Sequence, residues 1–149
     1  MNIRKIKKIV VIGTGVMGPD ISLGFAMAGY DVTAVDIEAP ILDRAAKKIS
    51  VNCKQMAEER IFSEKQVEKI KSRISLTLDW EKAVADADYI TEAVPEEMAT
   101  KKEVFKKCGE ICSEDVVIAS NTSSMSITKI ASEMRSPQRA ISTHWTIPA

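Results

Sequence analysis

Short runs of apolar, often β-branched residues alternate along the chain with segments whose apolar residues recur at helical spacing. The run KIVVIG at 8–13 ends in glycine and is typical of a buried parallel strand. Five further runs predict strands at 31–36, 74–78, 89–94, 116–120 and 139–145. Helices are predicted between them at 17–28, 41–60, 63–73, 80–85, 98–112 and 127–134, with a capping box of Ser63 and Gln66 opening the third.

Strands that are separated by helices require crossover connections, and these give a parallel sheet with helices on both faces. We therefore predict a doubly wound α/β fold, formed as a single domain by residues 1–149. Ligands of such sheets bind beyond the carboxyl ends of the strands. The residues that follow each strand are thus the candidates for function.

Composition and charge restrict the partners of this domain. The 149 residues can form one core, and the 21 basic and 21 acidic side chains create no net field that would attract nucleic acid or an anionic membrane. The longest apolar runs, IVVI and VVIA, are far shorter than the roughly 20 residues that span a bilayer. The basic start MNIRKIKK lacks the features of a signal peptide. We expect a soluble, cytoplasmic protein with no nucleic-acid and no membrane partner.

The cysteines do not predict a metal site. Cys53, Cys108 and Cys112 lack the paired spacing of a zinc site. Cys108 and Cys112 lie one helical turn apart, on the same stripe as Val104 and Phe105. We interpret them as packed side chains.

The first predicted strand runs into the sequence GTGVMG, which opens a predicted helix. Gly13 would allow a tight turn, Gly15 would let the backbone approach a pyrophosphate, and Gly18 would let the helix pack against the strand. The helix N-terminus would offer free N–H groups to the phosphates. The candidate cofactor-binding residues of this loop are Gly13, Thr14, Gly15, Val16, Met17 and Gly18.

Asp36 ends the second predicted strand, 18 residues after the third glycine. Its carboxylate would accept hydrogen bonds from the adenosine ribose hydroxyls and would repel a 2′-phosphate. The sequence therefore favours NAD over NADP as the cofactor. A plain turn between a strand and a helix is the competing interpretation, and the combination of strand, helix and acid disfavours it.

Four segments resemble, in order and spacing, the NAD-binding domain of the L-3-hydroxyacyl-CoA dehydrogenases. They are VIGTGVMGPDISLGFAMAGYDVTAVD, ADYITEAVPEEMATKKEVF, IASNTSSMSITKIA and STHW, and they extend over essentially the whole chain. The EAVPE and NTSS parts are the most specific, because unrelated dinucleotide-binding domains do not need them. The resemblance implies a Rossmann-type fold, NAD as the cofactor, and oxidation of an L-3-hydroxyacyl-CoA to the 3-ketoacyl-CoA, or the reverse reduction.

The resemblance also implies roles for residues after the fourth and fifth predicted strands. Glu96 would contact the cofactor on the nicotinamide side, and Lys101 would also reach NAD. Asn121 and Ser123 would hold the 3-oxygen of the substrate and the nicotinamide. Without the resemblance, Glu96 and Lys101 would be a solvated pair, and part of the serine-rich loop would cap the next helix.

His144 is the single histidine of the chain and lies at the end of the last predicted strand. The resemblance gives it the role of catalytic base. Removing a proton from a secondary alcohol as hydride leaves needs a base with a pKa near neutrality, which imidazole provides. A lone histidine is more often a bystander, but a place at the same sheet edge as the glycine loop favours catalysis.

Two parts of the chain depart from the pattern of the family. The family usually continues from the histidine as HFFNP, whereas this chain reads HWTIP, with Trp145, Thr146 and Ile147 at the altered positions. The CoA contacts of the family include a serine and a lysine on the helix after the second strand, where this chain has Asn52 and Glu59. CoA binding therefore has less support than NAD binding.

The candidates for CoA binding in this chain are Ser123, Asn52, Lys54 and Arg60. The family also has a glutamate beyond the histidine that orients the imidazole, and a helical domain that supplies the acyl cleft and the dimer interface. We therefore expect the chain to be the N-terminal part of a longer homodimeric enzyme, with little or no turnover by itself. Two alternatives stay open: a dehydrogenase of a free 3-hydroxy acid, and an NAD-binding module without catalysis.

Overall fold

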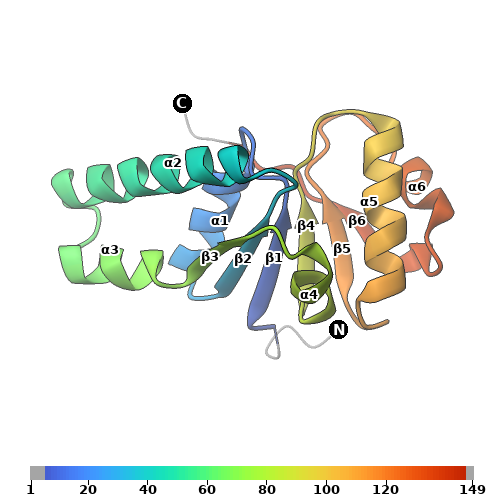
Figure 1. Cartoon of the computed structure of the whole chain (residues 1–149), viewed down its shortest axis with the longest axis horizontal. Coiled ribbons are helices and arrows are strands. Elements are labelled where there is room, and N and C mark those ends of the chain that lie inside the picture. Colours follow the sequence, from blue (N-terminus) through green and yellow to red (C-terminus); the bar gives the residue numbers. More distant parts are fainter. Residues whose placement is uncertain (1–5, 147–149) are drawn as a thin grey trace.

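The computed structural model describes residues 6–146, and these residues form one sheet of six strands (Figure 1). The strands are β1 (Lys8–Ile12), β2 (Asp31–Val35), β3 (Ile74–Thr77), β4 (Tyr89–Glu92), β5 (Val117–Ser120) and β6 (Ala140–Ser142). Every neighbouring pair is parallel, and the order across the sheet is β3-β2-β1-β4-β5-β6. The chain changes direction across the sheet between β1 and β4, so the predicted doubly wound α/β fold is confirmed.

Helices pack on both faces of this sheet. They are α1 (Gly18–Met27), α2 (Ala39–Glu58), α3 (Glu64–Lys71), α4 (Trp80–Ala85), α5 (Met98–Ile111) and α6 (Ile127–Ile130). Ile9 and Val11 of β1 share a core cluster with α1, α2 and α3, whereas Val10 and Ile12 share one with α4, α5 and α6. Burial on both faces explains why this strand is apolar at consecutive positions. Among the described helices, none is long and apolar enough to cross a membrane.

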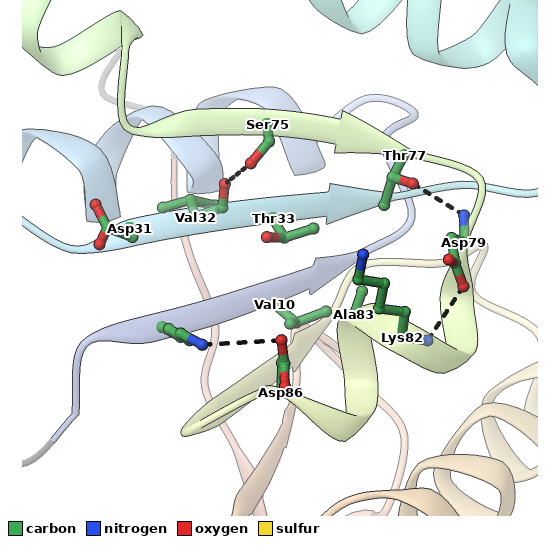
Figure 2. A pocket seen from close by; sticks show the side chains of 11 residues that line it. Val10, Asp31, Val32, Thr33, Ser75, Thr77, Asp79, Lys82, Ala83 and Asp86 are labelled. Carbon is green, nitrogen blue, oxygen red and sulfur yellow. Dashed lines mark hydrogen bonds and ion pairs between the residues drawn. The ribbon is translucent and has the colours of Figure 1, made fainter.

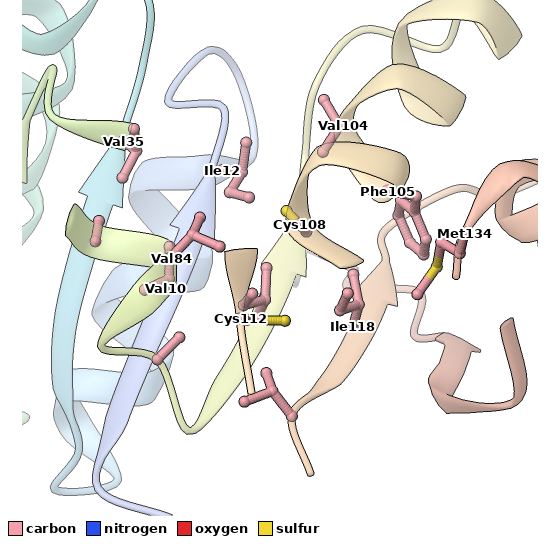
Figure 3. Close-up of a cluster of buried hydrophobic side chains, with 14 of the residues drawn as sticks. Val10, Ile12, Val35, Val84, Val104, Phe105, Cys108, Cys112, Ile118 and Met134 are labelled. Atoms are coloured by element: carbon pink, nitrogen blue, oxygen red, sulfur yellow. The ribbon is translucent and has the colours of Figure 1, made fainter. Parts of the chain in front are cut away.

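The cluster on the α5 side contains two of the cysteines (Figure 3). Cys108 and Cys112 are buried and unpaired there, next to Phe105, Ile118 and Met134. Burial raises the pKa of the Cys108 thiol well above its usual value and keeps it protonated. The predicted packing role is confirmed. Within the described part of the chain, no group of three or more His, Cys, Asp or Glu side chains could hold a metal ion.

The ends of two helices can be compared with the predictions. The predicted capping box opens α3: the Ser63 N–H donates to Gln66 Oε1 (2.9 Å), and the Gln66 N–H donates to Ser63 Oγ (3.4 Å). The helix predicted at 127–134 is wrong in length. It is α-helical only over α6 and continues as a 3-10 helix at Ala131–Glu133, a common way for a helix to end.

The last strand is also shorter than the predicted 139–145. Its partner β5 ends at Ser120, which pairs with Ser142, so the ladder stops there. Before the strand, the buried Arg139 guanidinium donates to backbone carbonyls near the C-terminal end of α5 and anchors the chain. His144 therefore lies in a loop just beyond the strand, at the carboxyl edge of the sheet.

Candidate active site

The glycine loop joins β1 to α1 where the strand order changes direction. Gly13 has a φ of 92°, and a Cβ there would lie 2.7 Å from Ala93 O, so only glycine fits. A Cβ at Gly18 would lie 2.0 Å from Gly13 O, because the start of α1 packs directly on the loop. At Gly15, apart from the glycine and its two chain neighbours, no atom of the described residues lies within 4 Å of such a Cβ. The loop thus leaves exposed backbone at the N-terminus of α1, which fits the diphosphate of a dinucleotide.

Asp36 is tied to this loop through the buried residue Thr14. The Thr14 N–H and hydroxyl both donate to Asp36 Oδ2, at 2.7 and 2.9 Å. The Ile37 N–H donates to Asp36 Oδ1 at 2.8 Å. A carboxylate can accept about four hydrogen bonds, so these three orient the group and leave acceptor capacity for a ribose hydroxyl. The structure brings Asp36 to the glycine loop and adds a contact that sequence reasoning missed.

Lys48 of α2 supports the same loop and was also missed. Its Nζ donates to Val16 O (2.8 Å) and pairs with Asp20 of α1 (2.6 Å). Asn52, one turn further along α2, donates to the other oxygen of Asp20 (3.0 Å). Lys48 and Val16 are 32 residues apart along the chain, so no local pattern predicts their contact. The spacing of Lys48 and Asn52 indicates only that they share a face of α2. The packing of α2 on α1 therefore helps to hold the loop in place.

A buried ion pair lies at the end of β4. The side chains of Glu92 and Lys101 are 0% and 1% exposed, and Lys101 Nζ lies 2.7 Å from Glu92 Oε1. Lys101 also donates to Val94 O (3.2 Å), and the other Glu92 oxygen accepts from Ser120 Oγ (2.6 Å). The pair connects β4, α5 and β5 in the interior. Sequence reasoning considered Lys101 but missed Glu92, although the EAVPE segment begins with it.

Glu96, in the loop before α5, lies between this pair and the serine-rich loop. Its Oε2 is 3.3 Å from Lys101 Nζ, and its Oε1 accepts from the hydroxyls of Thr122 and Ser124. The Thr122 hydroxyl, helped by the Lys101 ammonium, holds the pKa of Glu96 below its usual value. Lys101 bonds to Glu92 and Glu96, so it can act on a cofactor through Glu96. The predicted direct contact between Lys101 and NAD stays a prediction.

Replacing Thr122 with valine should raise the pKa of Glu96 towards its usual value, because the main donor to the ionised carboxylate is lost. A group with a lowered folded-state pKa contributes stability above its unfolded-state pKa, and this contribution disappears as the pH falls through the folded-state pKa. The stability difference between the wild type and the variant should therefore shrink as the pH falls below 4.5, the ordinary value for this group. NMR titration of the carboxyl carbon measures the pKa.

The control for this titration is Ser124→Ala, which removes only the longer contact of 3.3 Å. It should move the pKa of Glu96 less than Thr122→Val does. An unchanged pKa in the valine variant would contradict the role of Thr122.

Asn121 and Ser123 follow β5. The Asn121 N–H donates to Glu92 O (2.8 Å), and its Oδ1 accepts from the Trp145 N–H (2.8 Å). Because the amide oxygen is used in this way, the NH₂ group of Asn121 is the end that can donate to a substrate oxygen. Ser123 is exposed. Ser126 caps α6, which confirms the capping role for the later part of this loop.

Two hydrogen bonds bracket the exposed His144. On one side the Thr143 N–H donates to Ser120 O (2.9 Å), and on the other the Trp145 N–H donates to the Asn121 side chain (2.8 Å). The structure therefore brings His144 next to the residues that follow β5. Ile147, the last altered position of HWTIP, lies outside the described residues.

The CoA candidates on α2 are not gathered into one site. Asn52 is bonded to α1, and the exposed Lys54 is paired with Glu58 of its own helix (3.5 Å). Glu59 accepts from a glutamine one turn earlier (2.7 Å). Arg60 follows the helix in an exposed turn with a φ of 58°. CoA contacts from α2 stay a prediction.

A hollow of about 250 Å³ borders the candidate site. It lies between α1, α2 and the loop after β6, and Met17, Asn52 and Trp145 are among its lining residues. A larger hollow of about 340 Å³ lies over β1, β2 and β3 beside α4, where Thr33 and Ser75 face it (Figure 2). The residues that line the larger hollow include none of the predicted site residues. The hollow beside Trp145 is therefore the one relevant to the site.

The parallel sheet, the glycine loop at its switch point and the acid after β2 together define a dinucleotide-binding domain. A family model described as 3-hydroxyacyl-CoA dehydrogenase, NAD binding domain, matches residues 8–149. The chain belongs to this family, which confirms the predicted family and the predicted cofactor, NAD.

Individual relatives agree with this assignment. The chain is 37% identical over 144 residues to the probable 3-hydroxybutyryl-CoA dehydrogenase of Bacillus subtilis (strain 168), covering 97% of this chain and 50% of that protein. It is 36% identical over 141 residues to the 3-hydroxybutyryl-CoA dehydrogenase of Clostridioides difficile, covering 95% and 50%. The crystal structure of 3-hydroxybutyryl-CoA dehydrogenase from Escherichia coli K12 matches with a TM-score of 0.92 and 32% identity, covering 97% of this chain and 30% of that one. The chain thus spans about half the length of these two curated relatives.

Proposed function

We propose that this domain serves the NAD-linked oxidation of an L-3-hydroxyacyl-CoA to the 3-ketoacyl-CoA, or the reverse reduction, as part of a longer enzyme. The observation that carries the proposal is the bracketing of His144 by hydrogen bonds to Ser120 and Asn121, at the carboxyl edge where the glycine loop also lies. The relatives named 3-hydroxybutyryl-CoA dehydrogenase support the substrate class.

The residues that follow β5 and β6 would share the chemistry of this reaction. NAD, when bound, would supply the acceptor for the hydride that leaves C3 of the substrate. His144 takes the proton of the 3-hydroxyl, so that the C–O single bond becomes a carbonyl as the C3–H bond breaks. The Asn121 NH₂ group and the Ser123 hydroxyl donate to the 3-oxygen and stabilise the negative charge that develops on it. In the reverse direction His144 returns the proton.

Other residues would hold the cofactor. The N–H groups at the start of α1 would bind its diphosphate, and Asp36 would bind the adenosine ribose. Glu96 would lie on the nicotinamide side, held in place by Lys101 and Thr122.

Replacing Asp36 with alanine should weaken NAD binding by about 1.5–3 kcal/mol, the contribution of a charge-assisted hydrogen bond. The same change removes the shared acceptor of the Thr14 N–H and hydroxyl, so the loop should also lose order. Calorimetry on this chain measures both NAD and NADP binding. Asp115→Ala is the control. Asp115 is exposed and lies before β5, at the amino ends of the strands and so away from the glycine loop. Tighter binding of NADP than of NAD by the wild type would contradict the proposed role of Asp36.

The second candidate is a dehydrogenase of a free 3-hydroxy acid. Two observations favour it: Trp145 and Thr146 replace the family's aromatic pair, and Asn52 and Lys54 are bonded within α1 and α2. Assays of the longer protein with 3-hydroxybutyryl-CoA and with free 3-hydroxybutyrate separate the two candidates. We expect the thioester to have the higher kcat/KM. A preference for the free acid would select the second candidate, and turnover of neither substrate would favour an NAD-binding module.

A further inference from the structure

The side chain of Trp145 packs on α1, a helix that is far from it along the chain. Its ring lies edge-on to Phe25, with ring centroids 5.0 Å apart and an interplanar angle of 65°. It is partly buried and packs against the core cluster on the α1, α2 and α3 side of the sheet. The loop after β6 is thus attached to the helix that begins at the glycine loop.

Gly24 makes room for this ring. A Cβ at Gly24 would lie 2.9 Å from Trp145 Cζ3, closer than a Cβ normally approaches another carbon, and 3.4 Å from Cη2, at the limit of ordinary contact. Gly24 lies inside α1, where glycine is a poorer choice than alanine for helix stability. Close approach of the indole gives a physical reason for a glycine at this position.

The backbone of the same residue reaches the catalytic candidates. The Trp145 N–H donates to Asn121 Oδ1 at 2.8 Å and so orients the amide, leaving its NH₂ group for a substrate oxygen. His144 is the preceding residue. A shift of the Trp145 ring along α1 would therefore move both polar groups of the proposed reaction.

We propose that Trp145, seated in the notch left by Gly24, is a positioning residue that sets the placement of His144 and the orientation of Asn121 relative to α1. The inference rests on the proposed function, because it takes His144 and Asn121 as the groups that act on the substrate. It goes beyond that function by assigning specific roles to Trp145 and Gly24.

Gly24→Ala tests the proposal, because two explanations of Gly24 predict different results. Helix propensity alone predicts a higher melting temperature and no change elsewhere. If Gly24 instead makes room for the Trp145 ring, the added Cβ should displace the indole. In the 149-residue chain, the imidazole NMR signals of His144, the single histidine, and the side-chain amide signals of Asn121 should then shift.

Trp145→Phe supplies the rescue. A phenyl ring is smaller than an indole, so Gly24→Ala combined with Trp145→Phe should restore signals close to those of Trp145→Phe alone. Gly109→Ala in α5 is the matched control, since a Cβ there would meet its nearest atom at 3.6 Å, an ordinary contact. Unchanged His144 and Asn121 signals in Gly24→Ala would overturn the proposal, and so would the absence of rescue. Should Gly24→Ala fail to fold, Trp145→Phe alone must still shift both sets of signals.

Kinetics of the longer protein separate positioning from binding. Gly24→Ala should lower kcat by up to about 100-fold, the effect of a displacement of roughly 1 Å in a catalytic group. NAD affinity should change much less than kcat, because neither Gly24 nor Trp145 is among the residues proposed to bind the cofactor. An unchanged kcat would overturn the positioning role. Failure of the wild-type chain to bind NAD would instead count against the proposed function, whereas the NMR signals test the notch independently.

Discussion

Replacing Lys101 with methionine should lower the free energy of unfolding by about 3–5 kcal/mol, because it leaves the charge of Glu92 buried without a counter-ion. Glu92 would keep two donors, the Val94 N–H (2.7 Å) and the Ser120 hydroxyl (2.6 Å), but neither carries a compensating charge. Methionine is similar to lysine in length and apolar, so lost packing contributes little. Urea unfolding followed by circular dichroism measures the change.

Two further variants make this result specific to the buried pair. Combining Lys101→Met with Glu92→Gln removes both charges and should recover most of the lost stability. Lys107→Met breaks the exposed pair with Glu103 (2.7 Å) on the same helix and should have a much smaller effect. If the two single lysine variants are equally stable, Glu92 does not carry the buried charge that the structure indicates.

Replacing His144 with glutamine should lower kcat of the longer protein by about 10²–10⁴, the usual contribution of a positioned general base. NAD affinity should change little, because His144 is not among the residues proposed to bind the cofactor. Since His144 is exposed, the melting temperature should change little as well. Steady-state kinetics with a 3-hydroxyacyl-CoA, together with calorimetry of NAD, measure the separate effects.

Ser142→Ala is the control for this variant, since Ser142 is exposed on β6 two residues before the histidine. It should keep kcat close to the wild-type value. A glutamine variant that retains most of its kcat would remove His144 from the role of base, whatever its effect on NAD binding.

The fold could be predicted because its signals are local. β1 reads as a continuous apolar run because helices cover both of its faces, and glycine follows it because Gly13 takes a positive φ. The length of β6 could not be predicted in this way. It depends on where the partner strand β5 ends. The residues at 139–145 do not by themselves predict that end.

The site was predictable only in part, for a similar reason. Asp36 and the glycine loop were found because their spacing is itself a signal. The bonds that hold them, from Thr14 to Asp36 and from Lys48 to Val16, join residues 22 and 32 positions apart. Whether such side chains meet depends on how α1 and α2 pack, and a spacing rule does not contain that information. The burial of Lys101 was missed because a lysine one turn into a helix normally lies in solvent.

The two hydrogen bonds from Thr14 to Asp36 have a consequence for coenzyme engineering. An exchange of this acid for a smaller or basic residue is an obvious route to NADP acceptance, since it removes the group that repels a 2′-phosphate. In this chain the same exchange would release Thr14, whose N–H and hydroxyl both depend on Asp36 Oδ2. Asp36 therefore determines both the coenzyme preference and the geometry of the loop. We expect that a switch of preference will need a second substitution that gives Thr14 a new acceptor.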